Sequence, residues 1–166
     1  MSVRETYRLA AEVHRAYRGD TWHGPSIGEL LADVDAAVAA SRPIPEAHTI
    51  WEIVLHVTAW VREVARRLEG VEPGLPTPGD WPPVPKPTAE AWEATRAALA
   101  RAHEELRDAL ERFPEAQLDE LVGEDRSAPL GTGVSYYRML HGLMQHDAYH
   151  AGQIALLKKA VRAPGD

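Results

Sequence analysis

Apolar residues recur at helical spacing along almost the whole chain, and this periodicity limits the possible folds more than any other feature. The clearest example is the stripe formed by Ile53, Val57, Trp60, Val64 and Leu68. No segment alternates apolar and polar residues in the way that favours a strand. The expected helices cover residues 2–17, 26–40, 49–69, 88–113 and 134–162. Four long helices and one extra short helix therefore predict an all-α bundle.

Three capping boxes mark where helices are expected to begin. In this motif a Ser or Thr side chain caps the first turn, and a Glu three residues later bonds back to the capping residue. The three matches are Ser2 with Glu5, Ser26 with Glu29, and Thr49 with Glu52. We therefore predict that helices start at these positions.

Residues 70–87 contain seven prolines and cannot form a regular helix. A connection of this length can traverse the bundle, so that the helices before and after it run parallel. We expect Trp81 to hold the segment against the body of the protein. A plain connection is the favoured interpretation, and a site wall or lid is the alternative.

Composition excludes several classes of function. The net charge of -7 opposes a phosphate backbone, and no long basic run offsets it, so we expect no nucleic-acid partner. The chain has no cysteine, which rules out disulfides, thiolate-bound zinc and a cysteine nucleophile. It also lacks an apolar N-terminal segment for secretion and a stretch long enough to span a membrane. We therefore expect a cytoplasmic protein with no membrane partner.

Two histidines four residues apart, His146 and His150, carry the strongest chemical signal. On a helical projection both point along the apolar stripe that contains Leu143 and Ile154. Neighbouring imidazoles in a bundle interior need partners, because an unpaired buried polar group costs about 1–3 kcal/mol. A shared metal ion would satisfy both rings in their neutral form, and hydrogen bonds to other core groups would satisfy them without a metal. The pattern alone leaves both interpretations open.

His56 lies at the edge of the apolar stripe of the 49–69 helix and can face the bundle interior. A third imidazole from a second helix would complete a three-histidine site with an open coordination position. By itself, a histidine at such a position is more often a core residue. For His103, on the core seam of the 88–113 helix, we favour a buried, hydrogen-bonded role over a place in a site.

Two segments resemble motifs of the DinB-like (YfiT-type) family of metal-dependent enzymes. The segment His48–His56 is similar to the second-helix motif of that family, and Gln145–Ile154 is similar to its last-helix motif. The Trp22–Ser26 loop and the Arg42–Pro43 turn also match the usual layout. The resemblance covers nearly the whole chain, and we expect residues 1–166 to form a single DinB-like domain.

The resemblance implies a four-helix bundle with one long crossover, which would be residues 70–87. It implies that His56, His146 and His150 bind a divalent metal, usually zinc or nickel, and that the chain forms a homodimer. Some relatives transfer or isomerise small-molecule substrates with low-molecular-weight thiols, and many have no known activity. The family name refers to DNA-damage induction and implies no DNA binding.

A three-histidine metal supports two kinds of chemistry. It can supply hydroxide for hydrolysis, or it can hold an incoming thiol as the thiolate nucleophile. Glu63 lies near His56 on the helical projection and is a candidate general base, although a solvated surface role is the favoured alternative. Gln153 could hydrogen-bond a ligand or a metal-bound water, or be a surface amide. Asp147 could orient a ligand histidine on another helix, such as His56.

The leading hypothesis is therefore a metal-dependent enzyme, either a thiol S-transferase with a small thiol as cosubstrate or a hydrolase. A metal- or ligand-binding bundle without catalysis is the second hypothesis. The third is a structural bundle whose histidines are core residues.

Overall fold

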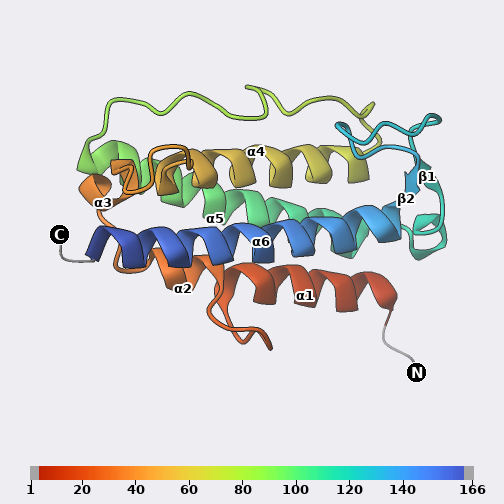
Figure 1. The fold of residues 1–166 in the computed structure, drawn as a ribbon. Coiled ribbons are helices and arrows are strands. Elements are labelled where there is room, and N and C mark those ends of the chain that lie inside the picture. The colour runs from red at the N-terminus through yellow and green to blue at the C-terminus, as the bar shows by residue number, and fades with distance from the viewer. Residues whose placement is uncertain (1–3, 163–166) are drawn as a thin grey trace.

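Four long helices lie side by side along one axis (Figure 1). The computed structural model describes residues 4–162. Its long helices are α1 (Glu5–Arg18), α4 (Ile50–Leu68), α5 (Ala89–Arg112) and α6 (Tyr136–Arg162). The shorter elements are helices α2 (Ile27–Leu31) and α3 (Ala36–Ala40), a 3-10 turn (Glu115–Gln117), and strands β1 (Leu121–Val122) and β2 (Val134–Ser135). The predicted all-α bundle is confirmed.

The helix order around the bundle is α1, α5, α4 and α6, since each packs against the next and α6 packs against α1. In Figure 1, α4 and α5 run in one direction, whereas α1 and α6 run in the other. The chain leaves the end of α4 and returns along the outside of the bundle before α5 begins. The Pro-rich segment 70–87 is therefore the long crossover that its length predicted.

Two of the three predicted capping boxes are present. The Ser26 and Thr49 side chains each accept a hydrogen bond from the backbone of the glutamate three residues later, and that glutamate bonds back. The third box involves Ser2, which lies outside the described residues. Helix α1 begins at Glu5 and has Arg4 at its N-cap position, with no side-chain cap bond.

The predicted helix over residues 26–40 is wrong in its continuity, because the structure divides it into α2 and α3. The Asp35 side chain accepts a hydrogen bond from the Val38 backbone and starts a new helix there. Just before this cap, the Val34 carbonyl accepts a hydrogen bond of 2.7 Å from the buried indole of Trp92. This contact comes from α5, so no periodicity within residues 26–40 could have indicated it.

The expectation that no strand forms is also wrong at one place. Strands β1 and β2 pair in antiparallel register, with Leu121 opposite Ser135 and Val122 opposite Val134. Gly131 and Gly133, between the strands, have positive φ angles of 65° and 66° that favour glycine. Each strand spans two residues, which is too short to produce an alternating pattern in the sequence. The two strands lie at one end of the bundle (Figure 1).

The core lies between the long helices and contains the residues of the predicted stripes. Its largest fully buried side chains include Trp51 and Trp92, whose rings lie 5.1 Å apart. Both indole N–H groups have acceptors, since Trp51 donates to Thr95 Oγ1 at 3.1 Å and Trp92 donates to Val34. None of the helices in the described part of the chain has both the length and the apolar character needed to cross a bilayer.

Candidate metal centre

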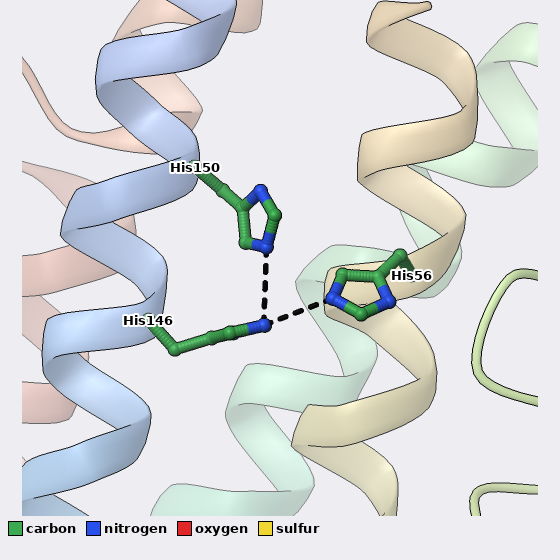
Figure 2. Close-up of side chains that lie close together, drawn as sticks. All are labelled: His56, His146 and His150. Atoms are coloured by element: carbon green, nitrogen blue, oxygen red, sulfur yellow. Dashed lines mark hydrogen bonds between the residues drawn. The ribbon is translucent and has the colours of Figure 1, made fainter. Parts of the chain in front are cut away.

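Three imidazoles converge between α4 and α6 (Figure 2). Helix α4 supplies His56, and α6 supplies His146 and His150 from consecutive turns of its inner face. The Nε2 atom of His146 lies 2.9 Å from Nε2 of His56 and 3.1 Å from Nε2 of His150. His56 and His150 are buried, with 6% and 4% of their surface exposed. The structure thus brings together the three histidines that the sequence singled out.

The tautomers of these rings make the cluster suited to a cation. His56 Nδ1 donates to the Asp80 carbonyl at 2.7 Å, and His150 Nδ1 donates to Gln153 Oε1 at 2.6 Å. In a neutral imidazole the other nitrogen then carries only a lone pair. Both Nε2 lone pairs face His146 Nε2, which holds at most one proton, so one close contact is left without a proton. A metal ion would accept all three lone pairs.

The spacing of the nitrogens fits such an ion. Two ligands of a tetrahedral zinc with Zn–N bonds of about 2.0–2.1 Å lie about 3.3 Å apart. The two Nε2–Nε2 distances of 2.9 and 3.1 Å are close to that value. Nδ1 of His146 is buried and has no hydrogen-bond partner within residues 4–162. No fourth His or carboxylate joins the cluster in the part of the chain that the structure describes.

The surroundings keep the three rings neutral. Burial lowers the pKa of His56 and of His146 below the usual 6.5, because desolvation disfavours the charged form. Burial and, to a smaller extent, the neighbouring His146 together lower the pKa of His150 to about 4. Hydrogen bonds oppose these shifts, from Asp80 at His56 and from Gln153 at His150. Neutral imidazole is the form that binds metal, so the ligand form is present at pH 7.

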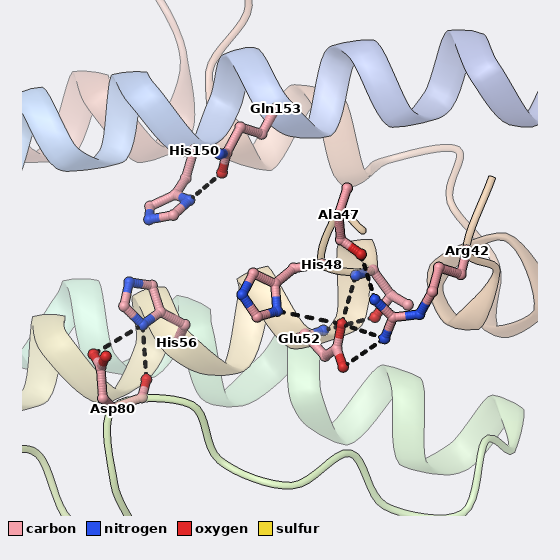
Figure 3. A network of polar contacts seen from close by, with 9 residues as sticks. Arg42, Ala47, His48, Glu52, His56, Asp80, His150 and Gln153 are labelled. Carbon is pink, nitrogen blue, oxygen red and sulfur yellow. Dashed lines mark hydrogen bonds and ion pairs between the residues drawn. The ribbon is translucent and has the colours of Figure 1, made fainter. Parts of the chain in front are cut away.

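The crossover forms one wall of the centre (Figure 3). The Trp81 ring stacks on His48 at 3.6 Å between centroids and on His56 at 3.9 Å. The neighbouring Asp80 contacts His56 through its carbonyl, and its carboxylate accepts a hydrogen bond of 2.6 Å from the Trp60 indole. Trp81 does hold the segment to the body, as predicted. The favoured interpretation of a plain connection is wrong, because the segment positions a candidate ligand.

Asp147 does not orient His56, and the example given for its predicted role is wrong. It is buried and contacts Nε2 of His103 at 3.2 Å, while Nδ1 of His103 contacts the Leu99 carbonyl at 3.1 Å. His103 is therefore the buried, hydrogen-bonded residue that the sequence favoured. The carboxylate beside His56 comes from Asp80, which sequence reasoning missed because the Pro-rich segment has no periodicity to orient its side chains. In that segment, only the neighbouring Trp81 indicated that the chain packs against the body of the protein.

The two candidate catalytic residues occupy different places. Gln153 contacts the centre, since its side-chain oxygen holds His150 (Figure 3). Glu63 is 1% exposed, so it is not a solvated surface residue. Its carboxylate accepts hydrogen bonds from Arg66, Arg67 and the Gly74 backbone, and it does not line the cavity beside the histidines. These contacts tie the start of the crossover to α4, so the structure does not bring Glu63 to the cluster.

A cavity of about 470 Å³ opens beside the histidines, between α4, α6 and the connection that carries β2. His56, His146 and Asp80 line one part of it, and apolar side chains such as Leu143 line the rest. This volume lies within the range of small-molecule sites, about 300–1,000 Å³. The candidate centre is thus accessible to a small organic molecule.

One comparison with known proteins gave a match. The sequence model of the DinB superfamily matches residues 20–154 of this chain. The matched region includes all three clustered histidines and the whole crossover. Comparisons with curated proteins and with solved structures found no match.

Proposed function

This chain belongs to the DinB superfamily, and from that membership and the histidine cluster we propose that it is a metal-dependent enzyme. It binds one divalent ion, zinc or nickel, through His56, His146 and His150, and it transfers a low-molecular-weight thiol to a small electrophilic substrate. The observation that carries the proposal is a group of three histidines whose ligand atoms lie within 4.8 Å of one another beside a cavity. A closed structural site would instead have a fourth protein ligand.

When bound, such an ion supplies Lewis-acid chemistry, because it lowers the pKa of a coordinated thiol or water. Thiol transfer suits this chain better than hydrolysis. A thiol with an ordinary pKa of about 8.5 is readily held as thiolate and needs no strong general base. The expected base for hydrolysis, Glu63, is occupied by Arg66 and Arg67. The chain has no cysteine of its own, so the thiol would be a cosubstrate.

The remaining residues of the centre would hold its ligands in place. Asp80 and Gln153 accept the Nδ1 protons of His56 and His150, which fixes both tautomers and ring orientations. Trp81 covers one face of the His56 ring and shields it from solvent. The cavity beside His146 would seat the substrate against the open coordination position.

A hydrolase is the second candidate, and a specific observation favours it. The Asp80 carboxylate lines the same cavity as His56 and His146. It could accept a proton from an attacking water after giving up its hydrogen bond from the Trp60 indole.

The test begins with elemental analysis of the full chain, purified without a histidine tag. The wild type is compared with His150→Ala and with His14→Ala, which removes an exposed histidine of α1 that does not belong to the cluster. We expect about one metal per chain in the wild type and in His14→Ala, and loss of the metal in His150→Ala. The same proteins are then assayed with glutathione and 1-chloro-2,4-dinitrobenzene, and with 4-nitrophenyl acetate.

Metal-dependent glutathione transfer would support the transferase, and metal-dependent ester hydrolysis would support the hydrolase. Stoichiometric metal without turnover in either the transfer assay or the ester hydrolysis assay would support a binding protein without catalysis. An absence of metal after incubation with zinc and with nickel would refute the proposed centre.

A further inference from the structure

The residues of α4 that line the cavity beside the centre change in chemical character along the helix. His56 lies at one end, Trp60 and Val64 follow at helical spacing, and Arg67 lies at the other end. Arg67 lies eleven positions after His56, which corresponds to about 16 Å along the helix. The cavity wall on α4 therefore changes from metal ligand to apolar surface to cation.

Helix α6 runs in the opposite direction and repeats this order. Its cavity-lining residues are Arg138, Met139, Gly142, Leu143 and His146. Arg138 and His146 are about 12 Å apart along the helix axis. The two helices run in opposite directions (Figure 1). Their histidines therefore meet at one end of the cavity, and their arginines lie at the other end.

Arg67 has hydrogen-bonding capacity left over at this cationic end. It is 2% exposed, and its guanidinium donates to Glu63 Oε1 at 3.0 Å and to the Gly74 carbonyl at 3.0 Å. The remaining nitrogen, Nη1, has the Met139 sulfur, at 3.9 Å, as its only hydrogen-bond acceptor among the described residues. A thioether is a weak acceptor, so these buried N–H groups lack a strong partner.

Two further arginines complete the cationic end. Arg126 lines the cavity from the connection before β2 and donates to the Thr132 carbonyl. The Arg138 guanidinium forms no hydrogen bond or ion pair with other described residues, although it too lines the cavity. One acidic residue, Asp80, lines the cavity, and it lies at the histidine end. Three arginines thus gather in a chain whose net charge is -7.

We propose that this cavity binds an elongated organic anion. Its anionic end lies against Arg67, Arg126 and Arg138, and its apolar body extends along Trp60 and Leu143 toward the histidines. Guanidinium groups recognise carboxylates through paired N–H donors, and the anion supplies the acceptor that Arg67 Nη1 lacks. The apolar walls favour a hydrocarbon or aromatic body over a sugar. That the other end carries the reacting group rests on the proposed metal-dependent function.

The test uses 4-phenylbutyrate as the probe and 4-phenylbutyramide as its neutral counterpart. Binding to the full chain is measured by isothermal titration calorimetry at low ionic strength, where charge interactions are least screened. Zinc-free and zinc-loaded protein are both titrated. The variants are Arg138→Gln, the double variant Arg126→Gln/Arg138→Gln, and Arg101→Gln. Arg101 is exposed and lies on α5, outside the cavity, so it controls for the loss of one charge.

We expect the acid to bind both forms of the wild type more tightly than the amide. Arg138→Gln should raise the Kd of the acid about fivefold, and the double variant should raise it by about tenfold or more. Arg101→Gln should leave it nearly unchanged. The substitution at Arg138 removes no side-chain hydrogen bond or ion pair within the described structure, so a normal melting temperature is expected and checks the fold.

Four results would overturn the inference: no binding of the acid, equal binding of acid and amide, an equal effect of Arg101→Gln and Arg138→Gln, or acid binding that requires zinc and ignores the arginines. The last result would mean that the carboxylate binds the metal itself. The metal content of the same protein, measured after incubation with zinc and with nickel, separates the two proposals. Arginine-dependent binding in protein that takes up neither metal would refute the metal centre and support the anion site. Uptake of either metal together with arginine-independent binding would support the metal centre and refute the anion site.

Discussion

We predict that the hydrogen bond between Gln153 and His150 increases the affinity of the centre for its metal. The Gln153 oxygen is the hydrogen-bond partner of His150 Nδ1, at 2.6 Å, and the ring is 4% exposed. Replacement by leucine, which has a similar size and no acceptor, would leave that N–H unpaired in the metal-bound state. Loss of such a supporting hydrogen bond lowers metal affinity about 10- to 100-fold, which corresponds to about 1.4–2.8 kcal/mol.

The assay is a zinc titration of Gln153→Leu in competition with a chromophoric chelator, at a pH above 7 so that all three imidazoles are neutral. Gln153→Glu keeps an oxygen that accepts the hydrogen bond from His150 Nδ1, and this variant should bind zinc at least as tightly as the wild type. Gln145→Leu is the matched control, because Gln145 is an exposed glutamine on the same helix, outside the group of clustered histidines.

An unchanged zinc Kd in Gln153→Leu would refute the assignment of Gln153 as the residue that positions His150. A large loss of affinity in Gln145→Leu would refute it as well, since the effect would then belong to the helix and not to the hydrogen bond. Unfolding in urea gives an independent check, because the metal-free variant should lose about 1 kcal/mol of stability.

Three further predictions concern stability. Asp147→Asn weakens the buried contact with His103 and should lower the free energy of unfolding by about 1–3 kcal/mol in urea, with metal content unchanged. Glu63→Gln leaves buried Arg67 without its ion pair and should cost about 3 kcal/mol or more, whereas a catalytic Glu63 would lose activity at unchanged stability. For metal-free protein, the folded pKa of His150, about 4, lies below its usual 6.5, so the unfolded chain binds protons first as the pH falls. The melting temperature should therefore decrease from pH 6.5 toward pH 4, and less steeply in His150→Leu.

Much of the fold could be predicted because its signals are local. The caps at Ser26 and Thr49 depend on residues within one turn, and both form as expected. The break before Asp35 was missed although its cap is local, and it is accompanied by a hydrogen bond from the distant Trp92. The strand pair at Val134 was missed because each strand spans two residues and is defined only by its pairing. Local pattern therefore identified the long helices and failed where a tertiary contact overrode it.

In the candidate centre, too, some features follow from the local sequence and others depend on tertiary packing. The sequence by itself determined that His146 and His150 share a helix face, since residues four apart lie one turn above each other. Only the tertiary structure decided that His56 meets them, because that distance depends on the packing of α4 against α6. It likewise decided that Asp80 supports His56 while Glu63 holds Arg67. A proline-rich crossover has no repeating geometry, so the position of its side chains follows from what they contact and not from their order in the chain.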